Sequence, residues 1–132
     1  MIYLCSPYTH TSEVVRNDRY LRTCVAAAKL IKKGQVIFSP IVHSLPLVKF
    51  GELGTLFSDW IEYNKAMMDI SLAVAVLPLS GWEQSNGVAF EIDYALKNNI
   101  TLWKVDLEKY EYVAFSTNIV PDTIKEYYIA QQ

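Results

Sequence analysis

The sequence predicts an α/β domain, a three-layer α-β-α sandwich around a mainly parallel, flavodoxin-like or Rossmann-like sheet. Short apolar runs alternate with longer segments whose apolar residues recur at three- and four-residue steps, which is the pattern of βαβ units. The run from Leu72 to Leu77 has no polar face, as expected for a parallel strand covered by helices on both sides. With 132 residues and no linker, the chain is expected to form a single domain over residues 1–132.

The first predicted elements are a strand over residues 1–5 and a helix from about Ser12 to Lys33. The helix begins at a serine that can cap it and ends at Gly34, after two lysines that favour a helix C-terminus. Apolar residues at three- and four-residue steps, or small multiples of them, support the helix. These residues are Val15, Leu21, Val25, Ala28 and Ile31.

The remaining elements follow in alternation. The stretch from Ile41 to Thr55 holds two glycines and a proline, so we expect it to be mostly loop. The pattern also predicts strands over residues 36–38, 71–79 and 100–105, helices over residues 57–68 and 86–97, and a C-terminal helix after Pro121.

Composition limits the partners and the location of the protein. The formal net charge is −2 and no block of basic residues exists, so no duplex nucleic acid is expected as a partner. Met1 leads straight into a strand pattern, and the longest apolar run is too short to span a bilayer. We therefore expect a cytoplasmic protein with no membrane partner. Cys5 and Cys24 are expected to be buried free thiols, and no metal site or cofactor is predicted.

A candidate site follows from the predicted sheet. Ligands of such sheets bind beyond the carboxyl ends of the strands, so residues 6–10, 39–45 and 80–87 are expected to meet at one crevice. A helix start at Ser85 and Gly87 offers unpaired N–H groups to an anion such as phosphate. Glu91 follows one turn later in an otherwise apolar helix, which predicts that it carries the chemistry.

Alternative readings stay open at this point. Ser85 can be only a helix cap, and Glu91 only a surface residue. Asp69 can be a plain helix-end residue, although a carboxylate near a helix C-terminus is electrostatically unfavourable, which indicates another duty. The chain contains neither a G-x-G-x-x-G nor a G-x-x-x-x-G-K-[ST] pattern, which argues against dinucleotide binding and kinase chemistry.

These segments resemble the nucleoside 2-deoxyribosyltransferase superfamily, including its nucleotide N-glycosidase branch, which cleaves the N-glycosidic bond of deoxynucleoside 5′-monophosphates. The resemblance covers about residues 1–106. It rests on L-C-S-P-Y at residues 4–8, Asp69 before the third strand, and S-N-G-V-A-F-E at residues 85–91. Small members of the superfamily also share F-S-P-I-x-H-S, here residues 38–44, and G-W-x-x-S-x-G-V-x-x-E, here residues 81–91.

The resemblance implies a role for each matched residue. Glu91 corresponds to the nucleophile that forms a glycosyl ester, Asp69 to the acid that protonates or holds the leaving base, and Tyr8 to a tyrosine that orients the nucleophile. Ser85 and Gly87 correspond to phosphate-binding positions. The other candidate substrate-binding residues are Ser6, Pro7, His43, Trp82 and Asn86, with structural hydrogen bonding for His43 and plain packing for Trp82 left open. Arg16, Arg19 and Arg22 are candidate phosphate ligands, most of them expected at the surface.

The leading hypothesis is a hydrolase that cleaves the N-glycosidic bond of a (deoxy)nucleoside 5′-monophosphate through a covalent glycosyl-glutamate intermediate. A deoxyribosyltransferase that exchanges bases and a non-catalytic nucleotide-binding protein are the alternatives. The resemblance also implies a homodimer or larger homo-oligomer, with the second long helix or the C-terminal part at the contact. Aromatic and methionine residues there support this expectation; they are Trp60, Tyr63, Met67, Met68, Tyr110, Tyr112, Phe115, Tyr127 and Tyr128.

Overall fold

The computed structural model describes residues 1–115 and confirms the predicted α/β sandwich. Its five-stranded sheet has the order β2-β1-β3-β4-β5, and only β5, at the edge, is antiparallel to its neighbour. The strands are β1 (Ile2–Cys5), β2 (Ile37–Phe38), β3 (Ala73–Val76), β4 (Thr101–Val105) and β5 (Tyr112–Ala114). The helices are α1 (Glu13–Lys32), α2 (Pro40–Gly51), α3 (Phe57–Asp69) and α4 (Asn86–Lys97), with a 3-10 turn at Trp82–Gln84.

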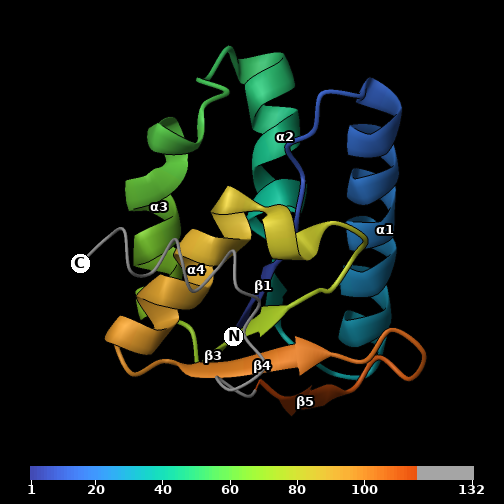
Figure 1. The fold of residues 1–132 in the computed structure, drawn as a ribbon, viewed down its shortest axis with the longest axis vertical. Helices are drawn as coiled ribbons and strands as arrows, with labels where there is room; N and C mark the ends of the chain where they lie inside the picture. The colour runs from blue at the N-terminus through green and yellow to red at the C-terminus, as the bar shows by residue number, and fades with distance from the viewer. Residues whose placement is uncertain (116–132) are drawn as a thin grey trace.

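The sheet is covered on both faces, as its apolar strands predict. Successive residues of a strand point to opposite faces, so Tyr3 and Cys5 of β1 enter one core while Ile2 and Leu4 enter the other. The first core packs against Met68 of α3 and the buried side of α4, and the second packs against α1. Figure 1 shows the same division, with α1 on one side of the molecule and α3 and α4 on the other.

Helix boundaries agree with the predictions where a cap marks them. Ser12 caps α1 by accepting a hydrogen bond from the backbone N–H of Val15, at 3.4 Å. Gly34 follows the helix with a φ of 87°, a left-handed conformation that glycine adopts without steric cost. The predicted helix over residues 86–97 is present with those bounds as α4.

The prediction of a loop from Ile41 to Thr55 is wrong, because α2 occupies most of that stretch. Ser39 caps this helix by accepting a hydrogen bond from the Val42 backbone N–H at 3.2 Å. Pro40 stands at its start, where the missing N–H costs nothing and the fixed φ suits a helix. The Ser-Pro pair that closes β2 is therefore also a helix start signal.

The apolar residues that marked the first helix are mostly not those that it buries. Leu21, Val25 and Ile31 are 62%, 50% and 53% exposed. The side of α1 that packs on the sheet carries small residues and one leucine instead, namely Thr23, Ala26, Ala27 and Leu30. Small side chains let a helix lie close to a sheet. The side of α1 that faces the sheet is therefore the one with small residues, and not the one with the largest apolar residues.

The sequence did not predict β5. Its approach is a turn in which the Asp106 carboxylate accepts the backbone N–H groups of Glu108 and Lys109 at 2.8 and 2.9 Å. These hydrogen bonds hold the pKa of Asp106 below its usual value. The predicted helix after Pro121 lies outside the described residues. Within residues 1–115, no helix has the length and apolar character to cross a membrane.

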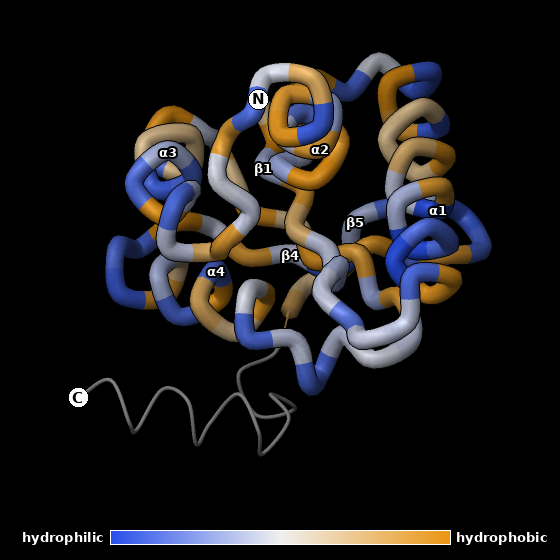
Figure 2. Tube along the Cα trace, turned by 90° about the horizontal axis from the view of Figure 1, so that it is seen from above, coloured by the Kyte–Doolittle hydropathy of each residue, from blue (hydrophilic) through white to orange (hydrophobic). Residues whose placement is uncertain are grey.

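Several residues expected at an oligomer contact are used within the chain. Met68 is fully buried, Tyr110 and Tyr112 pack against the α1-side core, and Phe115 packs against the other core. Tyr127 and Tyr128 lie outside the described residues. Exposed apolar side chains gather instead around the α2–α3 connection, and the α2 tube is largely hydrophobic in Figure 2. These side chains are Leu47, Phe50, Leu53, Leu56 and Phe57.

Candidate active site

The sheet order places a topological switch point between β1 and β3. The chain goes from β1 outward to β2 and then returns to add β3 on the other side of β1. Loops that leave β1 and β3 therefore diverge at the carboxyl edge of the sheet, which is where ligands bind in folds of this kind. The helix α4 starts from the β3 loop, and Glu91 lies in its middle with only 4% of its surface exposed.

Glu91 shares a buried cluster with Tyr3 and Cys5. Burial raises the pKa of Glu91 to about 8, and the Tyr3 hydroxyl partly offsets this by lowering it. Burial, and then the charge of Glu91, raises the pKa values of Tyr3 and Cys5 well above their ordinary values. Among the described residues, neither Tyr3 Oη nor Glu91 Oε2 has a partner in ordinary hydrogen-bond geometry. The cluster therefore holds buried polar atoms whose hydrogen-bonding capacity the described residues leave unused.

A second buried acid on the same helix, Asp93, has a cation partner, whereas Glu91 does not have one within residues 1–115. Asp93 is 6% exposed and forms an ion pair with Lys97 at 3.1 Å. Glu91 has no such cation within residues 1–115. A buried carboxyl without a cation stays protonated until the pH approaches its raised pKa, so it can donate a proton, or act as a nucleophile once ionised.

Ser85 caps the start of α4, and its role in binding a ligand remains a prediction. Ser85 Oγ accepts the Val88 backbone N–H at 3.2 Å, so the serine is a helix cap. The hydroxyl hydrogen is still free to donate to a phosphate oxygen. A Cβ at Gly87 would meet the Phe57 ring at 3.8 Å, an ordinary contact, so packing within the chain does not require glycine there. Asn86 is exposed beside it.

The loop after β1 places Tyr8 beside a groove between two helices. Tyr8 lines a groove of about 430 Å³ between α1 and α2, together with residues such as Asn17 and Leu45. None of the groups that shift the pKa of Glu91 is Tyr8, and the tyrosine that does so is Tyr3. Tyr3 therefore acts on Glu91 in the way that the resemblance implies for Tyr8, and the role of Tyr8 itself remains a prediction.

The first residues of the same loop are buried and hydrogen-bonded to α1. Ser6 is 5% exposed, and its hydroxyl lies 3.3 Å from the hydroxyl of Thr23 on α1. Pro7, next to it, is also buried. The contact with Thr23 holds the start of the loop to α1, and contact of Ser6 or Pro7 with substrate remains a prediction.

Asp69 has a defined partner at the end of α3. It is the last residue of α3, is exposed, and accepts a 2.6 Å hydrogen bond from the Tyr94 hydroxyl of α4. This hydrogen bond raises the pKa of Tyr94 to about 12. Because α3 ends before β3 begins, Asp69 lies toward the amino edge of the sheet, away from the crevice. This contact gives Asp69 a structural role at the end of α3, and its role as the acid for the leaving base remains a prediction.

His43 and Trp82 both have structural contacts. His43 of α2 is within hydrogen-bond distance of the Tyr63 hydroxyl, at 2.9 Å, and its ring stacks on Tyr63. Trp82 packs edge-on against Phe115, with ring centroids 6.0 Å apart. The structural alternative that the sequence left open is therefore realised for each, and contact of either with a ligand remains a prediction.

Sequence reasoning missed Tyr3 because it was counted only as a core residue of the first strand. A signal for it existed, since a tyrosine in a fully buried strand needs a partner for its hydroxyl. It stands two residues before Cys5, so both point to the same face of the sheet. The sequence pattern does not predict which helix covers that face.

The fold and the cluster define an α/β domain in which the helix after β3 of a mainly parallel sheet carries a buried carboxyl with no cation partner within residues 1–115. No group of three potential ligands among the His, Cys, Asp and Glu side chains of the described residues could hold a metal ion. The chain belongs to the family described as a domain of unknown function (DUF1937), whose model matches residues 1–105. Among curated proteins, no match to the chain is found.

Proposed function

We propose that this protein is a hydrolase that cleaves the N-glycosidic bond of a (deoxy)nucleoside 5′-monophosphate, with Glu91 as its nucleophile. The observation that carries the proposal is the Glu91 carboxyl, which is 4% exposed, has no cation among the described residues, and has an oxygen without a hydrogen-bond partner there. Such a group destabilises the fold when it ionises, so a role in chemistry is a better explanation than a role in stability.

The reaction runs in two displacements. The ionised Glu91 carboxylate attacks the anomeric carbon and forms an ester, while the carbon–nitrogen bond breaks and its electron pair leaves with the base, which takes up a proton. Water then attacks the same carbon, the ester carbon–oxygen bond breaks, and Glu91 leaves as a carboxylate. The proton that this water loses returns to solvent and balances the one that the base took from solvent in the first step. The Tyr3 hydroxyl can orient the carboxylate in both steps, because it already acts on its pKa.

Phosphate recognition is assigned to the start of α4. The first N–H groups of a helix and its partial positive charge suit a dianionic phosphate. The Ser85 hydroxyl hydrogen is free to donate, and Gly87 presents no side chain in front of these groups. A phosphorylated substrate therefore fits the geometry better than a free nucleoside.

The active form is further proposed to be a homodimer or larger. The exposed apolar side chains around the α2–α3 connection support a contact near α3, the helix that the sequence predicts over residues 57–68. Phe57 belongs to this set and packs near Gly87, so such a contact would adjoin the start of α4. Light scattering at micromolar concentration measures the mass directly, and one chain per particle at all concentrations would refute the proposal.

The test of the function is a panel of nucleosides and their 5′-monophosphates, each incubated with and without a second free base. Released base, resolved by chromatography, is the expected product, with monophosphates preferred. Exchange for the second base without net release would instead indicate the transferase. Intact-mass spectrometry of protein quenched during turnover should show an added deoxyribosyl phosphate, or ribosyl phosphate, on the wild type and none on Glu91→Gln. Absence of both release and exchange across the panel would refute the proposal and favour a non-catalytic nucleotide-binding protein.

A further inference from the structure

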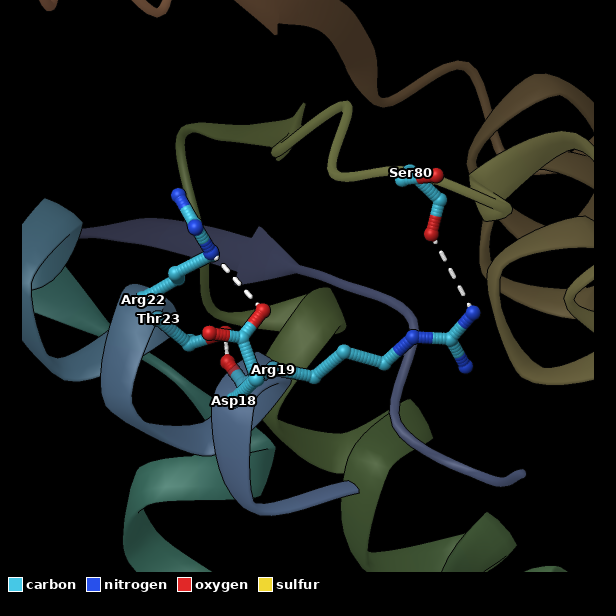
Figure 3. Close-up of polar contacts among 5 residues, drawn as sticks. All are labelled: Asp18, Arg19, Arg22, Thr23 and Ser80. Atoms are coloured by element: carbon cyan, nitrogen blue, oxygen red, sulfur yellow. Dashed lines mark hydrogen bonds and ion pairs between the residues drawn. The ribbon is translucent and has the colours of Figure 1, made fainter. Parts of the chain in front are cut away.

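Arg19 joins two loops that lie far apart in the sequence. From α1, its guanidinium donates one hydrogen bond to the backbone oxygen of Thr9 at 2.9 Å and a longer one to that of Tyr8 at 3.4 Å. Its other terminal nitrogen donates to the backbone oxygen of Ser80 at 3.1 Å. Figure 3 shows the side chain extended from α1 to Ser80. One side chain thus connects the loop after β1 with the loop after β3.

The backbone at Gly81 is shaped around this contact. Gly81 has a φ of 86°, and a Cβ there would lie 2.5 Å from Arg19 Nη2, far inside contact distance. Any larger residue at this position would both strain the backbone and displace the guanidinium. Gly81 also precedes the turn that leads to the start of α4. The position of the guanidinium and the entry of the chain into α4 are therefore linked.

The two neighbouring arginines of α1 do not make this connection. Arg16 donates to the backbone oxygens of His10 and Thr11, both in the loop after β1. Arg22 forms an exposed ion pair with Asp18 on the same helix, and Figure 3 shows it turned away from Ser80. Among the three, only Arg19 spans the switch point.

We infer that Arg19 is a positioning residue that sets the separation of the loops after β1 and β3 by holding them together at the switch point. A guanidinium is suited to this task because its planar fork presents donors in two directions, whereas a lysine ammonium is a single point. The consequence for turnover rests on the proposed function. Loops that are no longer held together should bind the nucleotide more weakly, while Tyr3 on β1 and Glu91 on α4 still carry out the chemistry.

The first test uses amide hydrogen exchange of the free protein and does not depend on any activity. Arg19→Ala should raise exchange about tenfold at residues 79–85, since loss of charge-assisted hydrogen bonds lowers the local opening free energy. Arg19→Lys should behave like Arg19→Ala. Arg16→Ala should affect only residues near 9–12, and Arg22→Ala neither segment. Unchanged exchange at residues 79–85 in Arg19→Ala, with a wild-type melting temperature, would overturn the inference.

A second variant reaches the same contact from the other loop. Gly81→Ala should open the same segment by displacing the guanidinium. In the Arg19→Ala background, Gly81→Ala should add only the smaller effect of backbone strain, because the guanidinium that the new Cβ would displace is absent. Fully additive effects of the two substitutions would count against the contact.

The third test measures turnover of the preferred nucleoside monophosphate. Arg19→Ala should raise KM about tenfold and change kcat less than about threefold, without rescue by Arg19→Lys. Rescue by lysine would overturn the positioning role, since charge alone would then suffice. A wild-type protein without any glycosidase or exchange activity refutes the proposed function alone, and hydrogen exchange still decides whether Arg19 holds the loops.

Discussion

Tyr3 of β1 and Glu91 of α4 are buried against each other, and each changes the pKa of the other. The two residues are separated by most of the chain and belong to different layers of the sandwich. Their contact forms because the Tyr3 side of β1 is the side that α4 covers. The candidate chemistry of this protein depends on this one relationship between a strand and a helix.

Glu91→Gln should abolish turnover while the fold remains intact. Glutamine keeps the shape of the side chain but cannot form the glycosyl ester, so we expect a rate loss of roughly 10³-fold or more. Base release from the preferred substrate is the measurement, with circular dichroism as the check on folding. Asp93→Asn is the matched control, a second buried acid of the same helix that should keep its turnover even if it loses stability. Turnover of Glu91→Gln within tenfold of wild type would eliminate Glu91 as nucleophile.

Glu91 should make the wild type progressively less stable than Glu91→Gln as the pH rises. Its folded-state pKa of about 8 exceeds the ordinary value of 4.5, so its contribution is intact below about pH 4.5 and is lost as the pH rises through about 8. The difference in unfolding free energy between the two proteins should therefore grow over this window by on the order of a few kcal/mol and then level off. Denaturant unfolding at several pH values measures it. A difference that is constant with pH would show that Glu91 has an ordinary pKa.

In Tyr3→Phe, the rise of kcat/KM with pH should occur at a higher pH than in the wild type. The Tyr3 hydroxyl lowers the pKa of Glu91, so its removal leaves only the raising effect of burial. Because the nucleophile must be ionised, the rise of kcat/KM with pH should shift upward in this variant. Tyr8→Phe tests the role that the resemblance implied for Tyr8. A shift in Tyr8→Phe and none in Tyr3→Phe would return that role to Tyr8.

Gly87→Ala should fold as well as the wild type and bind nucleoside monophosphates more weakly. The nearest atoms to an added Cβ are those of the Phe57 ring at 3.8 Å and Ser85 Oγ at 3.9 Å, so the chain itself tolerates alanine. Helix propensity even favours alanine, by up to about 1 kcal/mol. Calorimetry should show about tenfold weaker binding of the monophosphate and little change for the nucleoside. Gly51→Ala, at a comparably open helical position, should change neither. Equal affinity of Gly87→Ala and wild type for the monophosphate would show that the phosphate does not bind at the start of α4.

Asp69→Asn should leave turnover within about threefold of wild type, far above Glu91→Gln. We expect this because Asp69 is exposed and its carboxylate is hydrogen-bonded to Tyr94. Loss of the carboxylate should let the pKa of Tyr94 fall from about 12 toward its ordinary value of 10, because the hydrogen bond to Asp69 is the largest cause of the shift. Ultraviolet titration of the tyrosinates follows that change. A collapse of turnover in Asp69→Asn would restore the acid role that the resemblance implies.

Much of the architecture could be predicted from local signals. Unbroken apolar runs marked the parallel strands, and a serine cap marked the start of both α1 and α4. The prediction of a loop in place of α2 is wrong because a proline and two glycines in that stretch do not interrupt the helix. Pro40 in fact starts the helix, Pro46 is accommodated inside it, and Gly51 is its last residue. The antiparallel β5 escaped prediction because a three-residue edge strand has too short a pattern to stand out.

The sequence by itself determined the class of fold, the bounds of α4 and the presence of Glu91 in an apolar helix, since these depend on composition and spacing within short segments. Only the tertiary structure decided which side chains meet Glu91. It brought Tyr3 to the carboxyl, left Tyr8 in a groove between α1 and α2, and placed Asp69 with Tyr94. It likewise connected Arg19 to Ser80 across the switch point. The physical reason is that side-chain periodicity shows which residues share a face, whereas the packing of helices on the sheet determines what that face meets.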